Sequence, residues 1–162
     1  MERNDSILEG KPGVSSVEST DSRSLSVGIV GISESWRVSQ LLQLSGVAND
    51  PSQPYYPQFT IIARSHVENS SQVRSEDAGF ISVRFVDGVA YIVSIVVVPK
   101  HRRAGVAEKL FATAEDMAVI WDCKRMAFKL RKELKELTGA VVSRGYKMVM
   151  ETDGIGLFVK EL

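Results

Sequence analysis

The sequence predicts a mixed α/β fold in which a mostly antiparallel sheet has helices on both faces. Three observations lead to this prediction. Short β-rich runs alternate with segments of helical periodicity, two Asp-Gly pairs separate neighbouring β-rich runs, and the clearest helical segment directly follows the most apolar run. The chain has 162 residues, of which 44% are apolar, and this is enough for one domain with one core. We therefore expect a single domain over residues 25–162.

Residues 1–24 are predicted to be a polar, flexible tail. The segment holds six serines together with Gly10, Pro12, Gly13 and scattered apolar residues. Packing of so few apolar side chains cannot offset the entropy lost on ordering. An arm that becomes ordered on a partner is the alternative, and nothing in the segment identifies that partner.

The domain is predicted to begin with a strand, a helix and a loop. The strand covers residues 25–32, and Ser33 supplies the N-cap of a helix that ends near Gly46. Three prolines between residues 49 and 57 exclude regular structure there, so this segment is a loop. This loop contains Tyr55 and Tyr56.

Three predicted strands follow, and they cover residues 59–67, 78–86 and 89–98. Asp87-Gly88 between the last two is typical of a tight hairpin turn. The polar residues 68–76 are expected to be a connection rather than part of a strand.

A long amphipathic helix is predicted after Pro99, because apolar residues there recur at helical spacing on one face. They are Ala107, Leu110, Phe111, Ala114, Met117, Ala118 and Trp121. The remaining expected elements are a strand over 124–130, a helix over 131–143 that Gly145 terminates, and a hairpin with arms 146–151 and 155–160. Asp153-Gly154 supplies the turn of that hairpin.

Composition excludes several classes of protein. Twenty basic and twenty acidic side chains cancel, so no overall field attracts nucleic acid or a membrane surface. Cys123 is the only cysteine, and His66 and His101 lie far apart in the sequence, so neither a disulfide framework nor a metal site is expected. No apolar run is long enough to span a membrane and no secretory signal is evident, so we expect a cytoplasmic protein.

The segment from Ser94 to Leu110 has the features of an anion-binding turn. An apolar strand ends at Pro99, a basic turn containing Gly105 follows, and then the long helix begins. The first amides of a helix have no partner within the helix and lie at the positive end of its dipole, so they bind phosphate oxygens. Positive side chains gather there as well: Lys100, Arg102, Arg103 and Lys109.

This segment resembles the GNAT superfamily of acyl-coenzyme A dependent N-acyltransferases. The family motif, Arg or Gln followed by x-x-Gly-x-Gly/Ala, is matched by Arg102, Gly105 and Ala107. The preceding pattern, Val-x-Pro-x-x-Arg, is matched by Val97, Pro99 and Arg102. The order of elements from residue 25 to 162 is also similar, with one N-terminal helix where two are common. The resemblance implies a GNAT-like sheet with helices on both faces.

The resemblance also implies a cofactor, a reaction and a set of binding residues. Acetyl-coenzyme A is the expected acyl donor, and a primary amine is the expected acceptor. The amides of the turn hold the pyrophosphate, and the end of the preceding strand binds the pantetheine arm, with Val97 nearest the thioester. The cofactor-binding residues implied in this way are Ile95, Val96, Val97, Val98, Arg102, Arg103, Ala104, Gly105, Val106 and Ala107.

The sequence departs from the family where an acid and a base are usual. The place of the common tyrosine falls near Ala140 and Val141, which cannot donate a proton, and the strand over 90–98 has no carboxylate. Its polar side chains are Tyr91 and Ser94. The catalytic residues are therefore unassigned.

Other candidates for proton transfer lie outside that strand. Glu68, Glu76 and Asp77 are candidate bases, although solvated charges are the simpler interpretation. Tyr146 is expected to pack in the core, and His101 to be exposed. A catalytically degenerate binding or assembly module with this fold, with or without coenzyme A, is the alternative function.

Residues 124–147 form a second basic segment. It has eight Lys or Arg residues against Glu133 and Glu136, and so a charge of about +6. The preferred interpretation is a solvated helix face on which Arg131, Lys132 and Lys135 pair with these two glutamates. The 3′-phosphate of coenzyme A, an acidic substrate or nucleic acid are alternatives, but without interleaved aromatic residues nucleic acid is not expected. A homodimer through edge strands is left open.

Overall fold

The computed structural model describes residues 22–31, 34–45 and 59–162. Several predicted features lie outside these residues: the tail up to residue 21, the N-cap at Ser33, the helix end near Gly46, and the loop with Tyr55 and Tyr56.

Seven strands form one sheet in the order β1-β2-β3-β4-β5-β7-β6, and among the described strands only β4 and β5 pair in parallel. The strands are β1 (Ser22–Ile29), β2 (Phe59–Asn69), β3 (Gln72–Val86), β4 (Val89–Val97), β5 (Arg125–Arg131), β6 (Lys147–Thr152) and β7 (Ile155–Glu161). The prediction of a mixed, mostly antiparallel sheet is confirmed.

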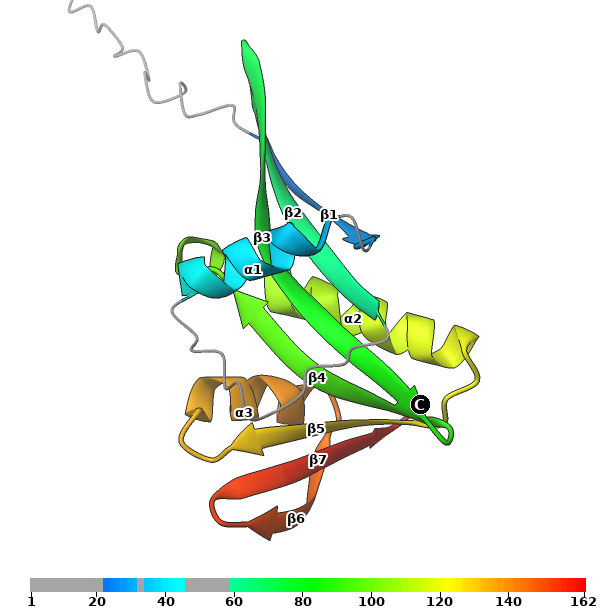
Figure 1. Cartoon of the computed structure of the whole chain (residues 1–162). Helices are drawn as coiled ribbons and strands as arrows, with labels where there is room; N and C mark the ends of the chain where they lie inside the picture. Colours follow the sequence, from blue (N-terminus) through cyan, green and yellow to red (C-terminus); the bar gives the residue numbers. More distant parts are fainter. Residues whose placement is uncertain (1–21, 32–33, 46–58) are drawn as a thin grey trace, which may run out of the picture.

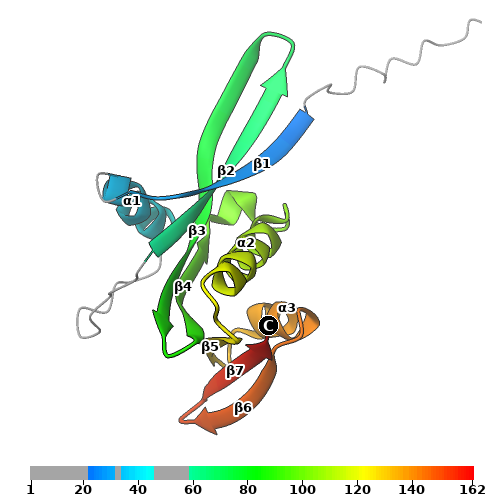
Figure 2. The same ribbon diagram turned by 90° about the vertical axis from the view of Figure 1, so that its right-hand side faces the viewer.

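In the described part of the chain, three helices cover the two faces of the sheet. Helix α1 (Ser35–Ser45) lies on one face, while α2 (Val106–Ile120) and α3 (Lys135–Ser143) lie on the other (Figures 1 and 2). A short 3₁₀ turn, Pro99–His101, links β4 to the segment before α2. Within the described residues, no helix has the length and apolar character that a bilayer span requires.

The two faces of the sheet contribute to two separate cores. Successive residues of a strand point to opposite faces, and in β2 the fully buried Ile61 packs in the cluster of α2 while Ile62 packs in the cluster of α1. Leu41 is the buried residue of α1, and Leu110 is one of several from α2. The unequal size of the clusters reflects the length of α2.

The tight turns have the geometry that their residues predict. Asp87 and Gly88 both have positive φ, and so do Asp153 and Gly154, as a type I′ hairpin turn requires. At the end of α3, Gly145 has φ 98°, and its amide and that of Tyr146 donate to Val142 and Val141, respectively. These two hydrogen bonds form the Schellman motif that a glycine C-cap makes possible.

The expected connection over 68–76 is wrong, because these residues belong to a long β2–β3 hairpin. Strand β2 continues to Asn69, and β3 begins at Gln72. The Asn69 side chain closes the turn by accepting from the amides of Ser71 and Gln72 at 3.1 and 2.9 Å. The arms of the hairpin extend beyond the helices (Figure 2). Both faces are solvated there, so no apolar alternation marks the strands in the sequence.

Three predicted boundaries also move. Strand β1 begins at Ser22, inside the expected tail, because it pairs with β2 as far as Glu68, and it ends at Ile29 rather than at residue 32. Helix α3 begins at Lys135 rather than at residue 131, because Arg131 pairs with Ile155 and extends β5. The amide of Lys132 then donates to Gly154, which delays the helix further.

Candidate functional site

Strands β4 and β5 separate halfway along the sheet. Their pairing ends at Ile92 and Phe128, although β4 continues to Val97 and β5 to Arg131. In Figure 1 the two strands start side by side and diverge toward their arrowheads. The register with β3 shifts at the same place, since Val83 faces Ile92 and Ser82 faces Ser94. Val93 is therefore the extra residue of a β-bulge.

Among the described residues, no strand pairs with one side of the β4 backbone beyond the bulge. The amide of Val98 donates to the carbonyl of Ala78 at 2.9 Å, so this peptide faces the β3 side. Peptide groups alternate along a strand. The backbone N–H and C=O groups of Ile95 and Val97 therefore face the opening toward β5, whereas those of Val96 and Val98 face β3.

The side chains of the same four residues line both faces beside the opening. Ile95 and Val97 pack against the cluster of α2, while Val96 and Val98 belong to the cluster that contains Leu41 of α1. The opening between the strands therefore has apolar walls and an interior of free backbone groups. This combination suits an amide-containing chain that hydrogen-bonds like a strand.

The turn between β4 and α2 places several backbone amides together. Arg103 and Gly105 both have positive φ, 66° and 80°, and Gly105 is the N-cap of α2. The amide of Lys109 makes the first helical hydrogen bond, to the carbonyl of Gly105 at 3.1 Å. The amides of residues 106–108 precede this hydrogen bond and are available to an anion.

The sequence-predicted residues of the turn are mostly at the surface. Arg102, Arg103, Ala104 and Gly105 are exposed, Ala107 is half-buried, and Val106 is buried. A Cβ atom on Gly105 would meet no atom of the described residues within 4 Å. The space over the helix start is therefore open to a ligand.

Positive charge surrounds this turn. Lys100 and His101 both contact Glu76, at 2.8 and 3.0 Å from Oε1. Within the described part of the chain, Arg102, Arg103 and Lys109 have no acidic partner. Three cations therefore remain to attract an anionic ligand.

The candidate bases are either committed to ion pairs or distant from the opening. The Arg37 guanidinium donates to Asp77 at 2.6 and 2.8 Å, and Arg64 lies 3.2 Å from the same carboxylate. The hydrogen bond from Arg37 is the main cause that lowers the pKa of Asp77, and the hydrogen bond from Lys100 likewise lowers the pKa of Glu76. A carboxylate held ionised in this way is a poor base. Glu68 lies on the exposed β2–β3 hairpin.

The usual place of a proton-donating tyrosine holds no donor. Val141 is fully buried in the core, and Ala140 precedes it on α3. On the α1 face of the sheet, Ser94 is opposite Ser82, whose hydroxyl lies 2.7 Å from that of Thr60. Tyr91 is 40% exposed on β4. These hydroxyl groups are polar side chains near the point where β4 and β5 separate.

Sequence analysis missed a buried ionic cluster around Glu115. Its carboxylate accepts hydrogen bonds from Arg144, Lys160 and Tyr146, at 2.9, 3.0 and 3.1 Å. The cluster joins the middle of α2 to the end of α3 and to β7. An acidic residue among the apolar positions 111, 114 and 118 of a predicted helix face was the available indication.

Tyr146 packs in the core, as its place before a strand predicted. It is 1% exposed, and its hydroxyl is used by Glu115. Burial, followed by the charge of Glu115, raises the pKa of Tyr146 well above its ordinary value. The phenol is therefore a buried hydrogen-bond donor and remains protonated.

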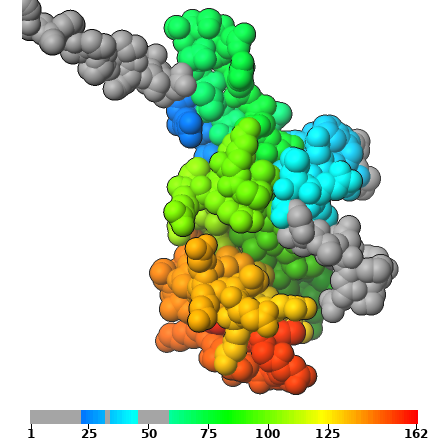
Figure 3. Space-filling model, turned by 90° about the vertical axis from the view of Figure 1, so that its left-hand side faces the viewer, coloured from blue at the N-terminus to red at the C-terminus, as the bar shows by residue number. Residues whose placement is uncertain are grey.

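The basic segment over 124–147 is divided among separate ion pairs. Lys124, Arg125, Lys132 and Arg144 pair with Asp122, Glu161, Glu151 and Glu108, respectively. The expected pairing of Arg131, Lys132 and Lys135 with Glu133 and Glu136 is not observed, because the β5–α3 connection directs Lys132 toward β6. In the space-filling view, α3 (orange) borders the yellow-green surface of the β4–α2 turn (Figure 3).

The residues present fit an acyl-coenzyme A molecule. A pyrophosphate needs free amides and positive charge, which the β4–α2 turn supplies. A pantetheine arm needs an apolar slot with free backbone groups, which β4 supplies beyond its bulge. Arg102 to Ala107 would hold the pyrophosphate, and Ile95 and Val97 would hold the pantetheine arm.

Comparison with solved structures shows the same fold in known acetyltransferases. The ribosomal-protein-S18-alanine N-acetyltransferase of Escherichia coli has 12% identity and a TM-score of 0.65, over 85% of this chain and 94% of that chain. The PaiA N-acetyltransferase of Thermoplasma acidophilum, solved with coenzyme A, has 11% identity and a TM-score of 0.63, over 86% and 99%. The IAA acetyltransferase of Bacillus cereus has 13% identity and a TM-score of 0.64, over 86% and 100%.

Sequence comparison agrees with the fold. A search of curated proteins finds no match to this chain. The model of the acetyltransferase (GNAT) family, in contrast, matches residues 34–136, which is more than half of the chain and includes β4, the basic turn and α2. The chain belongs to the GNAT acetyltransferase family.

Proposed function

We propose that this protein is an N-acetyltransferase that transfers the acetyl group of acetyl-coenzyme A directly to a primary amine. One observation supports this most strongly. The unpaired end of β4 is followed, through the 3₁₀ turn Pro99–His101, by the basic turn at the start of α2, so the proposed thioester slot and pyrophosphate site are neighbours along the chain. Family membership supports an acyltransferase independently.

The amide of Val97 is the group we assign to the thioester carbonyl. It faces the opening, and β5 no longer pairs with this part of β4. A fixed N–H aimed at a carbonyl oxygen stabilises the negative charge that develops there during attack, by about 3 kcal/mol in comparable sites. Bound acetyl-coenzyme A supplies the activated acyl group and a thiolate leaving group.

Positioning of the thioester and the amine is the other main contribution to the reaction rate in this proposal. The walls formed by Ile95, Val96 and Val98 hold the thioester arm straight and exclude water from one side of it. An amine held at the correct distance then reacts without the entropy loss of a bimolecular encounter. Tyr91 and Ser94 are the polar groups that we place toward the acceptor. Because Glu76 and Asp77 are committed to cations, the amine proton is assigned to water.

Coenzyme A binding tests the proposed pyrophosphate site. Substitution Gly105→Glu places a carboxylate over the free amides, and we expect calorimetric titration with acetyl-coenzyme A to show at least about a hundredfold weaker binding. The matched control is Gly88→Glu, because Gly88 has a similar φ, 77°, and similarly open space, but lies in a distant turn. The control carries the same backbone strain and should bind like the wild type.

Two results would reject the cofactor assignment. One is a wild-type protein, folded by circular dichroism, that does not bind acetyl-coenzyme A at millimolar concentration. The other is equal binding by the Gly105 and Gly88 variants, which would place the pyrophosphate elsewhere.

Turnover tests the assignment of Val97. Substitution Val97→Pro removes the amide that faces the opening, while the amide of Val98 still donates to Ala78. We expect kcat for thiol release in a panel of amines to fall by about a hundredfold, measured at saturating acetyl-coenzyme A so that weaker cofactor binding does not contribute. Unchanged kcat would exclude this amide from the reaction.

A binding module is the second candidate function. Ala140 and Val141 stand where a proton donor is usual, and the nearby carboxylates are neutralised. Tight acetyl-coenzyme A binding without thiol release, with any amine in the panel, would favour this function over catalysis.

A further inference from the structure

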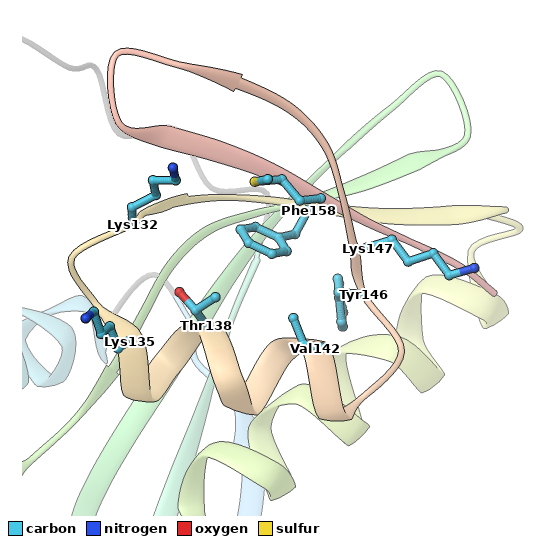
Figure 4. A pocket seen from close by; sticks show the side chains of 8 residues that line it. Lys132, Lys135, Thr138, Val142, Tyr146, Lys147 and Phe158 are labelled. Atoms are coloured by element: carbon cyan, nitrogen blue, oxygen red, sulfur yellow. The ribbon is translucent and has the colours of Figure 1, made fainter.

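A second pocket lies away from the proposed acyl-coenzyme A site. Its volume is about 720 Å³, and it opens between α3 and the β6–β7 hairpin (Figure 4). None of its lining residues belongs to β4 or to the turn before α2. Pockets that hold small organic molecules have volumes of this order.

Apolar groups form the walls of this pocket. Val142 of α3 and Met148 of β6 are 52% and 48% exposed, although both side chains are apolar. Phe158 of β7 and Tyr146 complete the lining between them. The Tyr146 hydroxyl donates to Glu115, so this residue contributes its ring and not its polar group. A ligand that covers these side chains needs an apolar body.

Both ends of the pocket carry positive charge, and two of its three lysines share one end. Lys132 and Lys135 lie together at that end, beside the start of α3, and Lys147 lies at the opposite end (Figure 4). The Lys132 ammonium is 2.8 Å from Glu151, whereas Lys135 and Lys147 have no acidic partner within the described residues. Among the described residues, no acidic side chain lines the pocket. The charge complementary to its lysines is negative, and the end with Lys132 and Lys135 offers two ammonium groups.

We propose that this pocket binds a small amphipathic carboxylate, a molecule with an apolar chain and one anionic end. The chain lies along Val142, Met148 and Phe158, and the carboxylate meets Lys135 with Lys132 beside it. An ammonium–carboxylate contact of this kind is a charge-assisted hydrogen bond. The site is distinct from the acetyl-transfer site and does not depend on it.

Titration with sodium octanoate, followed by two-dimensional amide NMR, tests the proposal. We expect saturable shifts in residues of α3, β6 and β7, including Val142 and Met148, and no comparable shifts in the turn before α2. Acetate lacks the apolar chain, and octylammonium has the opposite charge. Both should bind at least about tenfold more weakly than octanoate.

Two variants at exposed positions separate the charged and apolar contributions. Lys135→Glu reverses the free cation, and Val142→Glu places charge and bulk on the apolar wall. Each should weaken octanoate binding by about tenfold or more. Lys129→Glu is the matched control, because Lys129 is an exposed β5 lysine outside the pocket that has no acidic partner in the described part of the chain. It should bind octanoate like the wild type.

Three results would overturn the proposal: no octanoate shifts in the wild type, equal binding by wild type and both pocket variants, or octylammonium binding as strongly as octanoate. The outcome is also separable from the proposed function. The Gly105→Glu variant should retain octanoate binding, and Lys135→Glu should retain acetyl-coenzyme A binding.

Discussion

Substitution Gly79→Ala is expected to destabilise the protein by about 3 kcal/mol and to lower its Tm by roughly 10 °C. Gly79 is buried in β3, opposite Val97. A Cβ atom there would lie 2.4 Å from the carbonyl oxygen of Val96 and 3.2 Å from the Cα of Val97. Both are backbone atoms, so no side-chain rotation can relieve the overlap. Strand β4 would have to move away from β3.

Chemical denaturation, followed by circular dichroism, measures this loss of stability. Gly28→Ala is the matched control, because Gly28 lies in β1 and a Cβ atom there would meet nothing within 4 Å. We expect the control to remain within about 0.5 kcal/mol of the wild type. If the Gly79 variant is as stable as the control, the close approach of β3 and β4 is refuted. Because the displaced residues line the proposed thioester slot, any folded Gly79 variant should also bind acetyl-coenzyme A more weakly.

Substitution Glu115→Gln is expected to cost about 3 kcal/mol of unfolding free energy, because it leaves two partly buried cations without their shared anion. The side chain of Glu115 is 12% exposed, and its partners Arg144 and Lys160 are 15% and 25% exposed. Glu108→Gln is the matched control, since Glu108 pairs with the same Arg144 but is 66% exposed. Loss of that exposed pair should cost less than about 1 kcal/mol. Equal losses of unfolding free energy in the two variants would show that the burial of Glu115 does not increase its contribution to stability.

The effect of Glu115 should depend on pH. Burial raises the pKa of this carboxyl, but hydrogen bonds from Arg144 and Lys160 outweigh burial and hold the pKa below the ordinary value of 4.5. A group whose pKa is lower in the folded protein contributes its full stability above the ordinary value. That contribution is lost as pH falls through the lower value of the folded state. The stability difference between wild type and the Gln variant should therefore shrink below about pH 4.5, and a constant difference would contradict this linkage.

The sequence predicted the features that depend on residues close together in the chain, such as tight turns and the buried face of a helix. The turns at Asp87-Gly88 and Asp153-Gly154 require positive φ, and the sequence places glycine and aspartate there. The buried face of α2 follows its helical spacing, with Leu110, Phe111 and Ala114 all in the core. Trp121, predicted on the same face, is instead exposed and stacks on Phe85, because α2 ends one residue before it.

Features that depend on distant partners were not predictable in this way. The end of the β2–β3 hairpin is held by backbone pairing, which does not require apolar side chains. Residues 68–76 therefore show no alternation of apolar and polar side chains that would predict a strand. The partners of Asp77 and Glu115 come from other elements, and the sequence does not show which cations reach them. For the site, the motif around Gly105 led to the turn, but the structure was needed to tell which backbone groups of residues 95–98 are free.

The bulge at Val93 also limits how the length of β4 can change. Before it, the even-numbered residues Ala90 and Ile92 belong to the α2 cluster, and after it the odd-numbered Ile95 and Val97 do. The extra residue therefore exchanges the faces to which even- and odd-numbered residues point. Because side chains and peptide groups alternate with a period of two residues, inserting or deleting one residue between Ser94 and Val98 would turn every following peptide to the opposite side of the strand. The amide assigned to the thioester would then face β3 instead of the opening. Related sequences should therefore differ in this segment by substitutions and not by insertions or deletions.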